Sequence, residues 1–252
     1  MKKKIGVFDS GLGGLSILNE LVKLMPNEDY LFYEDSINNP YGEKSDAELL
    51  KIASKIVDYL IANNCKIIVI ACNTATASCM KKLREMYPDV IFVGIVPAIK
   101  VAYDRKYKYT IVLSTAYTAN SKRVEDLIND YKNDDQVIIN ISGKNLANLI
   151  ELGKMEEVEE LLNDLLSKYN EVADSIVLGC THYSLIKDEI SKVLPNVDLL
   201  DGSIGVSREV KRQLSEHNLL TDSLEKGKIV IENSKDTSLI DRSFEILNNL
   251  NK

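Results

Sequence analysis

Cys72 and Cys180 are the residues of this chain whose type and setting best suit acid/base chemistry. Each stands in the same short pattern of an apolar run, a small residue, the cysteine and then polar residues that are expected to open a helix, in IVIACNT (68–74) and IVLGCTH (176–182). The pKa of a free thiol is about 8.5, and the amino end of a helix can lower it enough to supply a thiolate near neutral pH. A single cysteine after a strand is as readily a small buried apolar residue, but two in the same context favour a chemical role.

Asp9 and Ser10 lie in VFDSGLGG (7–14), where an apolar run enters a glycine-rich turn ahead of a helix. The segment fails the G-x-G-x-x-G pattern of dinucleotide sites because the residue three after Gly13 is Ser16, and the chain has no Gly-Lys-Ser/Thr phosphate loop. With free helix amides behind them, Asp9 and Ser10 suit the ammonium and carboxylate of an amino acid. The alternative is a pair that only caps the helix.

His182 lies two residues after Cys180 and is a candidate proton donor or electrostatic partner for that thiol, although a lone histidine is often only a hydrogen-bonded polar residue. Cys65 and Cys79 lack the strand-end setting, and we interpret them as structural. The 4 cysteines show no C-x-x-C spacing and the chain has only 2 histidines. The sequence therefore predicts neither disulfides nor a metal site.

Repeated strand and helix units must position these candidates. Short β-branched runs alternate with longer amphipathic segments, which predicts β-α units and parallel sheets. Strands are expected at 4–8, 30–33, 66–71, 91–95, 109–113, 137–141, 175–178, 197–200 and 228–232. Helices fill the spaces between them, with clear examples at 15–24, 46–63, 75–87, 121–131, 156–169 and 203–217. Because ligands bind beyond the carboxyl ends of parallel strands, both cysteines fall where binding chemistry is expected.

Two α/β domains fit this pattern better than one wide sheet, because Pro97 interrupts the chain after the fourth strand and a second β-α series begins near Tyr109. The expected first domain is 1–96 plus about 208–252, since the last strand and helix follow a returning helix, and the second is 97–207. If two such domains face each other, the two thiols could meet across a single cleft.

The composition, with 45% hydrophobic and 27% charged residues, is that of a compact globular protein. The net charge of −7 gives no reason to expect nucleic acid or anionic lipid as a primary partner, since both require a concentrated basic surface. The apolar stretch after 1–4 is broken by Asp9, which makes it too short for an export signal, and no apolar run approaches the roughly 20 residues of a membrane helix. We therefore expect a soluble, cytoplasmic protein without membrane association.

Four blocks of the sequence resemble the glutamate racemases of the aspartate/glutamate racemase superfamily, in the same order: DSGLGG (9–14), PYG (40–42), ACNTA (71–75) and GCTHY (179–183). The resemblance runs through nearly the whole chain and extends to VPA (96–98), Thr115, Thr118 and LIE (149–151). Any one block is weak evidence for the family. Four blocks in the same order that include both strand-end cysteines are specific evidence.

The resemblance implies two parallel-sheet α/β domains related by a pseudo-twofold, with the active site in the cleft between them. It implies interconversion of L- and D-glutamate without metal, pyridoxal phosphate or any other cofactor, and a D-glutamate product that enters peptidoglycan. A homodimer that takes glutamate as its small-molecule substrate is also implied.

Residue roles follow from the same resemblance, position by position. Cys72 would act on the D face of the substrate and Cys180 on the L face. Proton transfer would be assisted by Asp9, Glu151 and His182. The substrate-binding residues would be Asp9, Ser10, Pro40, Tyr41, Gly42, Cys72, Asn73, Thr74, Thr115, Thr118, Cys180, Thr181 and His182. The STAYT stretch (114–118) departs from the small, glycine-containing turn common in the family, and Ser184 replaces a frequent proline.

Three other functions remain open on the residues alone. Two thiols suit racemisation of aspartate or another amino acid as well, because the chemistry acts at any acidic Cα–H. A non-catalytic paralogue that binds an amino acid is a second alternative, against which the two intact thiols argue. A cysteine hydrolase is disfavoured because it needs one nucleophile with a base and an oxyanion hole rather than a second thiol.

Overall fold

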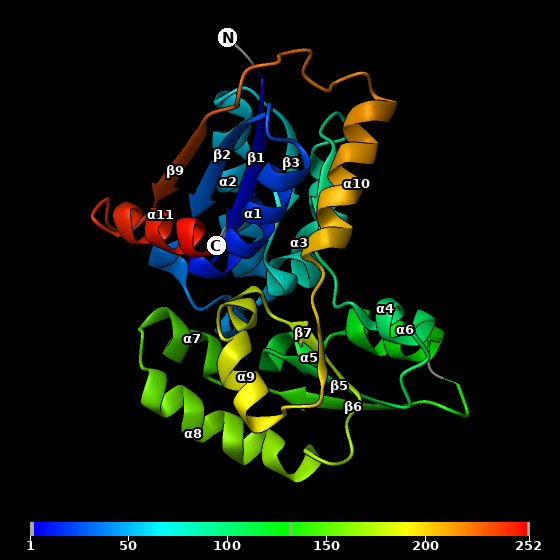
Figure 1. Ribbon diagram of the computed structural model, residues 1–252. Helices are drawn as coiled ribbons and strands as arrows, with labels where there is room; N and C mark the ends of the chain where they lie inside the picture. The colour runs from blue at the N-terminus through cyan, green and yellow to red at the C-terminus, as the bar shows by residue number, and fades with distance from the viewer. Residues whose placement is uncertain (1–2, 132, 251–252) are drawn as a thin grey trace. The chain divides into compact units, whose positions relative to one another are not determined.

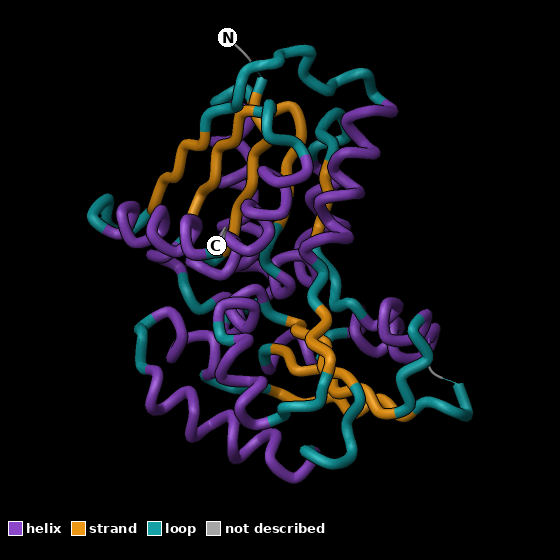
Figure 2. Tube along the Cα trace, viewed as in Figure 1, coloured by secondary structure: helices purple, strands orange, loops and turns teal. Residues whose placement is uncertain are grey.

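The structure is a computed structural model that describes residues 3–131 and 133–250. The chain divides into two compact units, Met1–Ile95 with Ser203–Lys252, and Val96–Gly202. Outside the described residues lie 1–2 and 251–252, at the two ends of the expected first domain, and residue 132. Each unit is built on a parallel sheet with helices packed against it, as Figure 1 shows by element and Figure 2 by type of structure.

The first unit is built on a five-stranded sheet in the order β4-β3-β1-β2-β9, with every pair of neighbours parallel. Its strands are β1 (Lys4–Asp9), β2 (Asp29–Glu34), β3 (Cys65–Ile70), β4 (Phe92–Gly94) and β9 (Ile229–Asn233). The central strand β1 is buried along all but its first residue. The last strand of the chain returns to this sheet, because β9 pairs with β2 from Tyr30 opposite Ile229 onward.

Helices cover both faces of this sheet (Figure 1). They are α1 (Leu15–Leu24), α2 (Asp46–Ala62), α3 (Asn73–Met86), α10 (Ser203–Glu216) and α11 (Leu239–Asn249). α2 packs against α3 over a core that includes Phe8 and Ile68, and α1 packs against α10. α2 begins at a capping box, in which the Ser45 hydroxyl accepts from the Glu48 N–H and the Glu48 carboxylate accepts from the Ser45 N–H.

The second unit is a four-stranded parallel sheet in the order β6-β5-β7-β8. Its strands are β5 (Tyr109–Ser114), β6 (Val137–Ser142), β7 (Ser175–Gly179) and β8 (Asp198–Leu200). Its helices are α4 (Ile99–Asp104), α5 (Ala116–Ala119), α6 (Lys122–Tyr131), α7 (Leu146–Glu151), α8 (Met155–Leu166) and α9 (Lys187–Val193). One core joins the sheet to α7, α8 and α9, and a second joins it to α4 and α6. The interior strand β7 is buried along its whole length, so the residues after it start from a rigid position.

The predicted fold class, α/β with two parallel-sheet units, is confirmed, and each expected strand is present with no end displaced by more than one residue. The main local difference follows Cys180, where the sequence predicts a helix and the chain forms a short 3-10 helix (Thr181–Leu185) before α9. Thr, His, Tyr and Ser are weak helix formers, which favours the tighter, shorter turn. In the described part of the chain, no helix has both the length and the apolar character needed to cross a membrane.

Candidate active site

In the first unit, the strand-end cysteine lies beside Ser10. β1 ends at Asp9, and beyond the end of β3 the N–H of Ala71 donates to the carbonyl oxygen of Phe8 at 2.9 Å. Cys72 follows as the amino cap of α3, and its thiol donates to Oγ of Ser10 at 3.9 Å. The structure therefore brings Asp9, Ser10 and Cys72 together at the carboxyl edge of the sheet, where the amino end of α3 favours negative charge.

Gly14 allows the close packing that buries Asp9. Asp9 is 0% exposed, and a Cβ on Gly14 would lie 2.6 Å from Cβ of Asp9 and 2.9 Å from the ring of Phe32. Such distances are too short for any side chain in a close-packed interior. The glycine-rich turn thus holds the start of the helical segment directly against the candidate carboxylate.

Asn73, the first residue of α3, carries a buried amide with unsatisfied polar atoms. The residue is 4% exposed, and neither Nδ2 nor Oδ1 of its side chain has a hydrogen-bond partner among the described residues. Leaving a buried donor or acceptor unsatisfied costs about 1–3 kcal/mol. An amide kept at that cost next to Cys72 has the character of a ligand-binding group.

The PYG segment (40–42) is tied to the end of β2 through Asp35. The hydroxyl of Tyr41 donates to Oδ2 of Asp35 at 2.6 Å, and the amide of Asn38 donates to both oxygens of the same carboxylate at 2.9 Å. Tyr41 is buried, and Pro40 and Gly42 are half-buried. Asp35 is not among the site residues predicted from the sequence. Its position directly after a strand, at the same sheet edge as Asp9, is the signal that could have identified it.

Tyr41 keeps its proton in this setting. Burial first, and then the charge of Asp35 and the hydrogen bond to it, raise the pKa of Tyr41 well above its usual range, and Cys72 and Asp9 add to the rise. Tyr41 also belongs to the same buried core as Cys72. The predicted binding segment and the candidate base of the first unit are therefore neighbours.

In the second unit, Cys180, His182 and Glu151 form a row of contacting side chains. Sγ of Cys180 lies 3.8 Å from Nδ1 of His182, and Nε2 of His182 lies 2.6 Å from Oε2 of Glu151. The His182 side chain is 2% exposed and that of Glu151, the last residue of α7, is 15% exposed. Three of the predicted catalytic residues thus meet at the end of β7.

The two neighbours of His182 favour its protonated form. Burial by itself would lower the pKa of His182, but the hydrogen bonds to Cys180 and Glu151, together with their charges, raise it well above 6.5. Glu151 fixes the orientation of the ring, so that a proton on Nδ1 points toward the sulfur. An imidazolium placed in this way can exchange a proton with the thiol or stabilise its thiolate.

Thr115 and Thr118 lie at the same sheet edge as Cys180, since β5 and β7 pair with Ser114 opposite Gly179. Thr115 caps α5: its Oγ1 accepts from the N–H of Thr118 at 3.2 Å and donates to the Thr118 hydroxyl at 3.0 Å. These contacts give both residues a structural role, and their binding of substrate stays a prediction. Thr74 and Thr181, which follow the two strand-end cysteines, are both buried.

Cys65 and Cys79 are placed differently from the strand-end cysteines. Burial raises the pKa of Cys65 to about 11 and also raises the pKa of Cys79. Both therefore remain thiols at neutral pH, which supports the interpretation of these two residues as structural.

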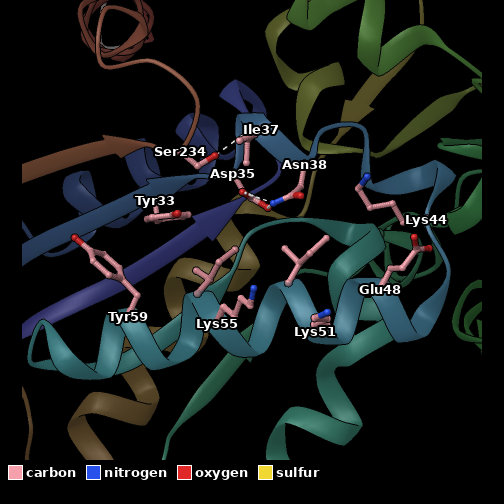
Figure 3. A pocket seen from close by; sticks show the side chains of 12 residues that line it. Tyr33, Asp35, Ile37, Asn38, Lys44, Glu48, Lys51, Lys55, Tyr59 and Ser234 are labelled. Carbon is pink, nitrogen blue, oxygen red and sulfur yellow. Dashed lines mark hydrogen bonds between the residues drawn. The ribbon is translucent and has the colours of Figure 1, made fainter.

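A cavity of about 610 Å³ lies in the first unit between α2 and the ends of β2 and β9 (Figure 3). Tyr33 and Tyr59 line one end of it, and Asp35 and Asn38 lie on its wall. None of the site residues predicted from the sequence lines this cavity.

Within residues 3–131 and 133–250, no group of three or more histidine, cysteine, aspartate or glutamate side chains could hold a metal ion.

Comparison with known proteins places this arrangement in a family. Residues 28–204, which include both strand-end cysteines, match the family described as Asp/Glu/Hydantoin racemase. A glutamate racemase from Clostridium botulinum is 42% identical over 252 residues, which cover 98% of this chain and 97% of the relative. This chain belongs to the Asp/Glu/Hydantoin racemase family.

Solved structures of the Asp/Glu/Hydantoin racemase family share the fold. A glutamate racemase from Escherichia coli, in complex with L-glutamate, matches with a TM-score of 0.85 at 28% identity over 99% of this chain and 96% of that one. One from Francisella tularensis, in complex with D-glutamate, has a TM-score of 0.83 at 28% identity over 98% and 94%. The resemblance drawn from the four sequence blocks is confirmed, and the protein is an amino-acid racemase, an isomerase.

Proposed function

We propose that this protein interconverts L- and D-glutamate by two-base racemisation, with Cys72 and Cys180 as opposed acid/base thiols. The observation that carries the proposal is the matched setting of the two cysteines. Each is buried and lies within two residues of the end of an interior strand of its own sheet. The relatives that cover almost the whole chain are named glutamate racemases, which supports glutamate as the substrate.

Inversion at Cα explains the need for two thiols. The proton on one face of Cα must leave, and another must arrive on the opposite face. A single base could do this only by swivelling around the substrate, whereas two bases on opposite sides need no such movement. In the proposed reaction, the thiolate of Cys72 takes the proton of D-glutamate while the Cys180 thiol donates one, and the roles reverse for L-glutamate.

The two thiols have different neighbours, so different groups would assist proton transfer at each of them. Cys180 exchanges its proton beside the His182 imidazolium, which Glu151 holds in place. Cys72 lies beside Ser10 and close to Asp9 at the amino end of α3. General acid/base assistance contributes roughly 10²- to 10⁴-fold, so electrostatic stabilisation of the carbanion must supply a large further part.

The proposed substrate contacts come from polar groups beside each cysteine. In the first unit, the amide of Asn73 has unsatisfied donors and acceptors to offer, and Ser10 and Thr74 add hydroxyls. The helix amides behind them favour a carboxylate, which becomes more negative as Cα loses its proton. The other proposed contacts are from Asp9, Pro40, Tyr41, Gly42, Thr115, Thr118, Thr181 and His182.

The cellular part of the proposal rests on the resemblance to glutamate racemases. The protein would work in the cytoplasm as a homodimer, use no cofactor, and supply D-glutamate for peptidoglycan.

Circular dichroism of L-glutamate incubated with the purified protein, without added cofactor, tests the proposal. We expect the signal to decay to zero, the value of the racemic mixture, and L-aspartate under the same conditions to keep its signal. Turnover of aspartate in place of glutamate would make the protein an aspartate racemase of the same family. Binding of glutamate with no turnover of either amino acid would contradict racemisation and favour a non-catalytic amino-acid-binding protein.

A further inference from the structure

We propose that Asp35 is a positioning residue for the substrate-binding segment 38–42, acting through Tyr41 and Asn38. The inference rests on the proposed racemisation, because segment 38–42 carries part of the proposed substrate site. Asp35 itself is not among the residues to which the resemblance assigns a role.

The backbone of Asp35 is attached to the candidate active-site edge of the first sheet. Asp35 directly follows β2, and its N–H donates to the carbonyl oxygen of Asp9 at 2.9 Å. Its side chain is buried, with only 1% of the residue exposed. Any segment held by this carboxylate is therefore fixed relative to Asp9.

The carboxylate accepts hydrogen bonds from two side chains of segment 38–42. Oδ2 accepts from the Tyr41 hydroxyl at 2.6 Å and from Nδ2 of Asn38 at 2.9 Å, and Oδ1 accepts from the same amide at 2.9 Å. Figure 3 shows the Asn38 side chain turned toward Asp35 on the wall of the cavity beside α2. A buried carboxylate without its donors is costly, so displacement of the segment is opposed.

Tyr41 transmits this restraint to the catalytic side. Its hydroxyl proton is committed to Asp35, and its ring packs in the same buried core as Cys72. Tyr41 therefore contributes ring position and neighbouring backbone to the site, rather than a hydroxyl that donates to substrate. Pro40 and Gly42, on either side of it, take their place from the same anchor.

Asp35→Ala and Asp35→Asn separate positioning from proton transfer. Alanine removes every acceptor, so KM for glutamate should rise about tenfold or more while kcat changes less. Asparagine keeps an oxygen that can accept from Tyr41, so KM should remain within about threefold of the wild type. A proton-transfer role would instead make both variants lose kcat to a similar extent, and that result would overturn the proposal.

Asp58→Ala is the matched control. Asp58 accepts from the hydroxyl of Tyr87 at 2.8 Å, so this variant also removes a tyrosine–carboxylate hydrogen bond in the first unit, away from segment 38–42. KM should not change. An equal rise of KM in Asp58→Ala and Asp35→Ala would show a general loss of packing and contradict positioning by Asp35.

Tyr41→Phe provides a second route to the same answer, including the case in which Asp35→Ala does not fold. It removes one of the three hydrogen bonds, so KM should rise by less than in Asp35→Ala, and combining the two should add little. An unchanged KM in Tyr41→Phe would by itself contradict the proposal. Where Asp35→Ala folds, fully additive effects of the two changes would contradict it as well.

Calorimetric titration with DL-glutamate separates this inference from the proposed function. The racemic mixture is already at equilibrium, so the heats report binding without net reaction. If the wild type binds the mixture but does not racemise glutamate, the proposed function fails. In that case a higher Kd in Asp35→Ala than in Asp35→Asn still supports positioning. If the wild type does not bind glutamate, both proposals fail.

Discussion

Nε2 of His182 lies 2.6 Å from Oε2 of Glu151, although 31 positions separate the two residues in the chain. The contact joins the 3-10 helix after β7 to the end of α7. On the other side of the ring, Nδ1 of His182 faces the sulfur of Cys180 at 3.8 Å. The carboxylate therefore sets the orientation and charge of the imidazole that the thiol meets.

Glu151→Gln should lower kcat in both directions of the racemisation. The change replaces a bond to a charged carboxylate, worth about 1.5–3 kcal/mol, by a bond to a neutral amide, worth about 0.5–1.5 kcal/mol. The difference of about 1–1.5 kcal/mol corresponds to roughly 5- to 13-fold in rate. Initial rates from L- and D-glutamate measure the effect. Glu157→Gln, which removes only an exposed ion pair with Lys154, is the control. Equal kcat in both variants would contradict an assisting role for Glu151.

The stability of the protein should fall above neutral pH in a way that depends on Glu151. The pKa of His182 is raised well above 6.5 in the folded protein. A raised pKa contributes stability that is fully present below the unfolded pKa of about 6.5, declines above it, and is lost once the pH has passed the folded pKa. Urea unfolding at a series of pH values should show a smaller decline for Glu151→Gln. Parallel pH profiles would rule out this linkage.

Cys72→Ser and Cys180→Ser should each lower kcat by roughly 10²- to 10⁴-fold, the usual contribution of general acid/base catalysis. Circular dichroism measures turnover, and titration with DL-glutamate checks that binding survives. Cys65→Ser is the control, because burial raises the pKa of Cys65 to about 11 and the thiol cannot act as a base near neutrality. A strand-end variant with turnover like that of Cys65→Ser would show that one thiol is dispensable.

Exchange of the Cα proton in D₂O should assign each thiol to one face. With Cys180 replaced by serine, Cys72 can still remove the proton of D-glutamate and return deuterium to the same face, so D-glutamate should exchange faster than L-glutamate. Cys72→Ser should show the opposite preference. Proton NMR of the Cα signal follows the exchange. The reverse preference in both variants would exchange the proposed roles of the two cysteines.

Asn73→Ala should weaken glutamate binding without destabilising the free protein. The buried amide has no hydrogen-bond partner among the described residues, so its removal relieves an unsatisfied group in the absence of substrate. We expect Kd to rise about tenfold, the value of one or two hydrogen bonds, while Tm is unchanged or higher. Calorimetry and thermal melts give the two quantities. A lower Tm with normal Kd would make Asn73 a structural residue.

Glu28→Ala should strongly destabilise the first unit. Glu28 and Lys66 form a buried ion pair at 2.6 Å, and they also bind the backbone of Thr221 and Leu219 after α10. Removing the carboxylate leaves the Lys66 charge buried, which typically costs about 3–5 kcal/mol. Urea unfolding measures the loss. Glu159→Ala, which breaks an exposed pair with Lys192, should cause no measurable change, and similar losses in both variants would contradict the argument.

The strands, the main helices and the family could be predicted from the sequence. Strand positions followed from runs of β-branched residues, and helix positions from amphipathic segments, because both signals involve residues close together in the chain. Cys72 and Cys180 were found in the same way, since a strand followed by a cysteine can be read from a few neighbouring residues. The four ordered blocks then predicted the family, and comparison with known proteins confirmed it.

Contacts between residues far apart in the chain became known from the folded structure. The pairing of β9 with β2, the contact of Glu151 with His182 and the anchoring of Tyr41 by Asp35 join distant segments, and the sequence analysis predicted none of these three contacts. The structure also showed that the amide of Asn73 is buried without a partner among the described residues, and that a 3-10 helix follows Cys180. Such features depend on how side chains fill the space between elements, and the spacing of residue types along the chain does not encode that packing.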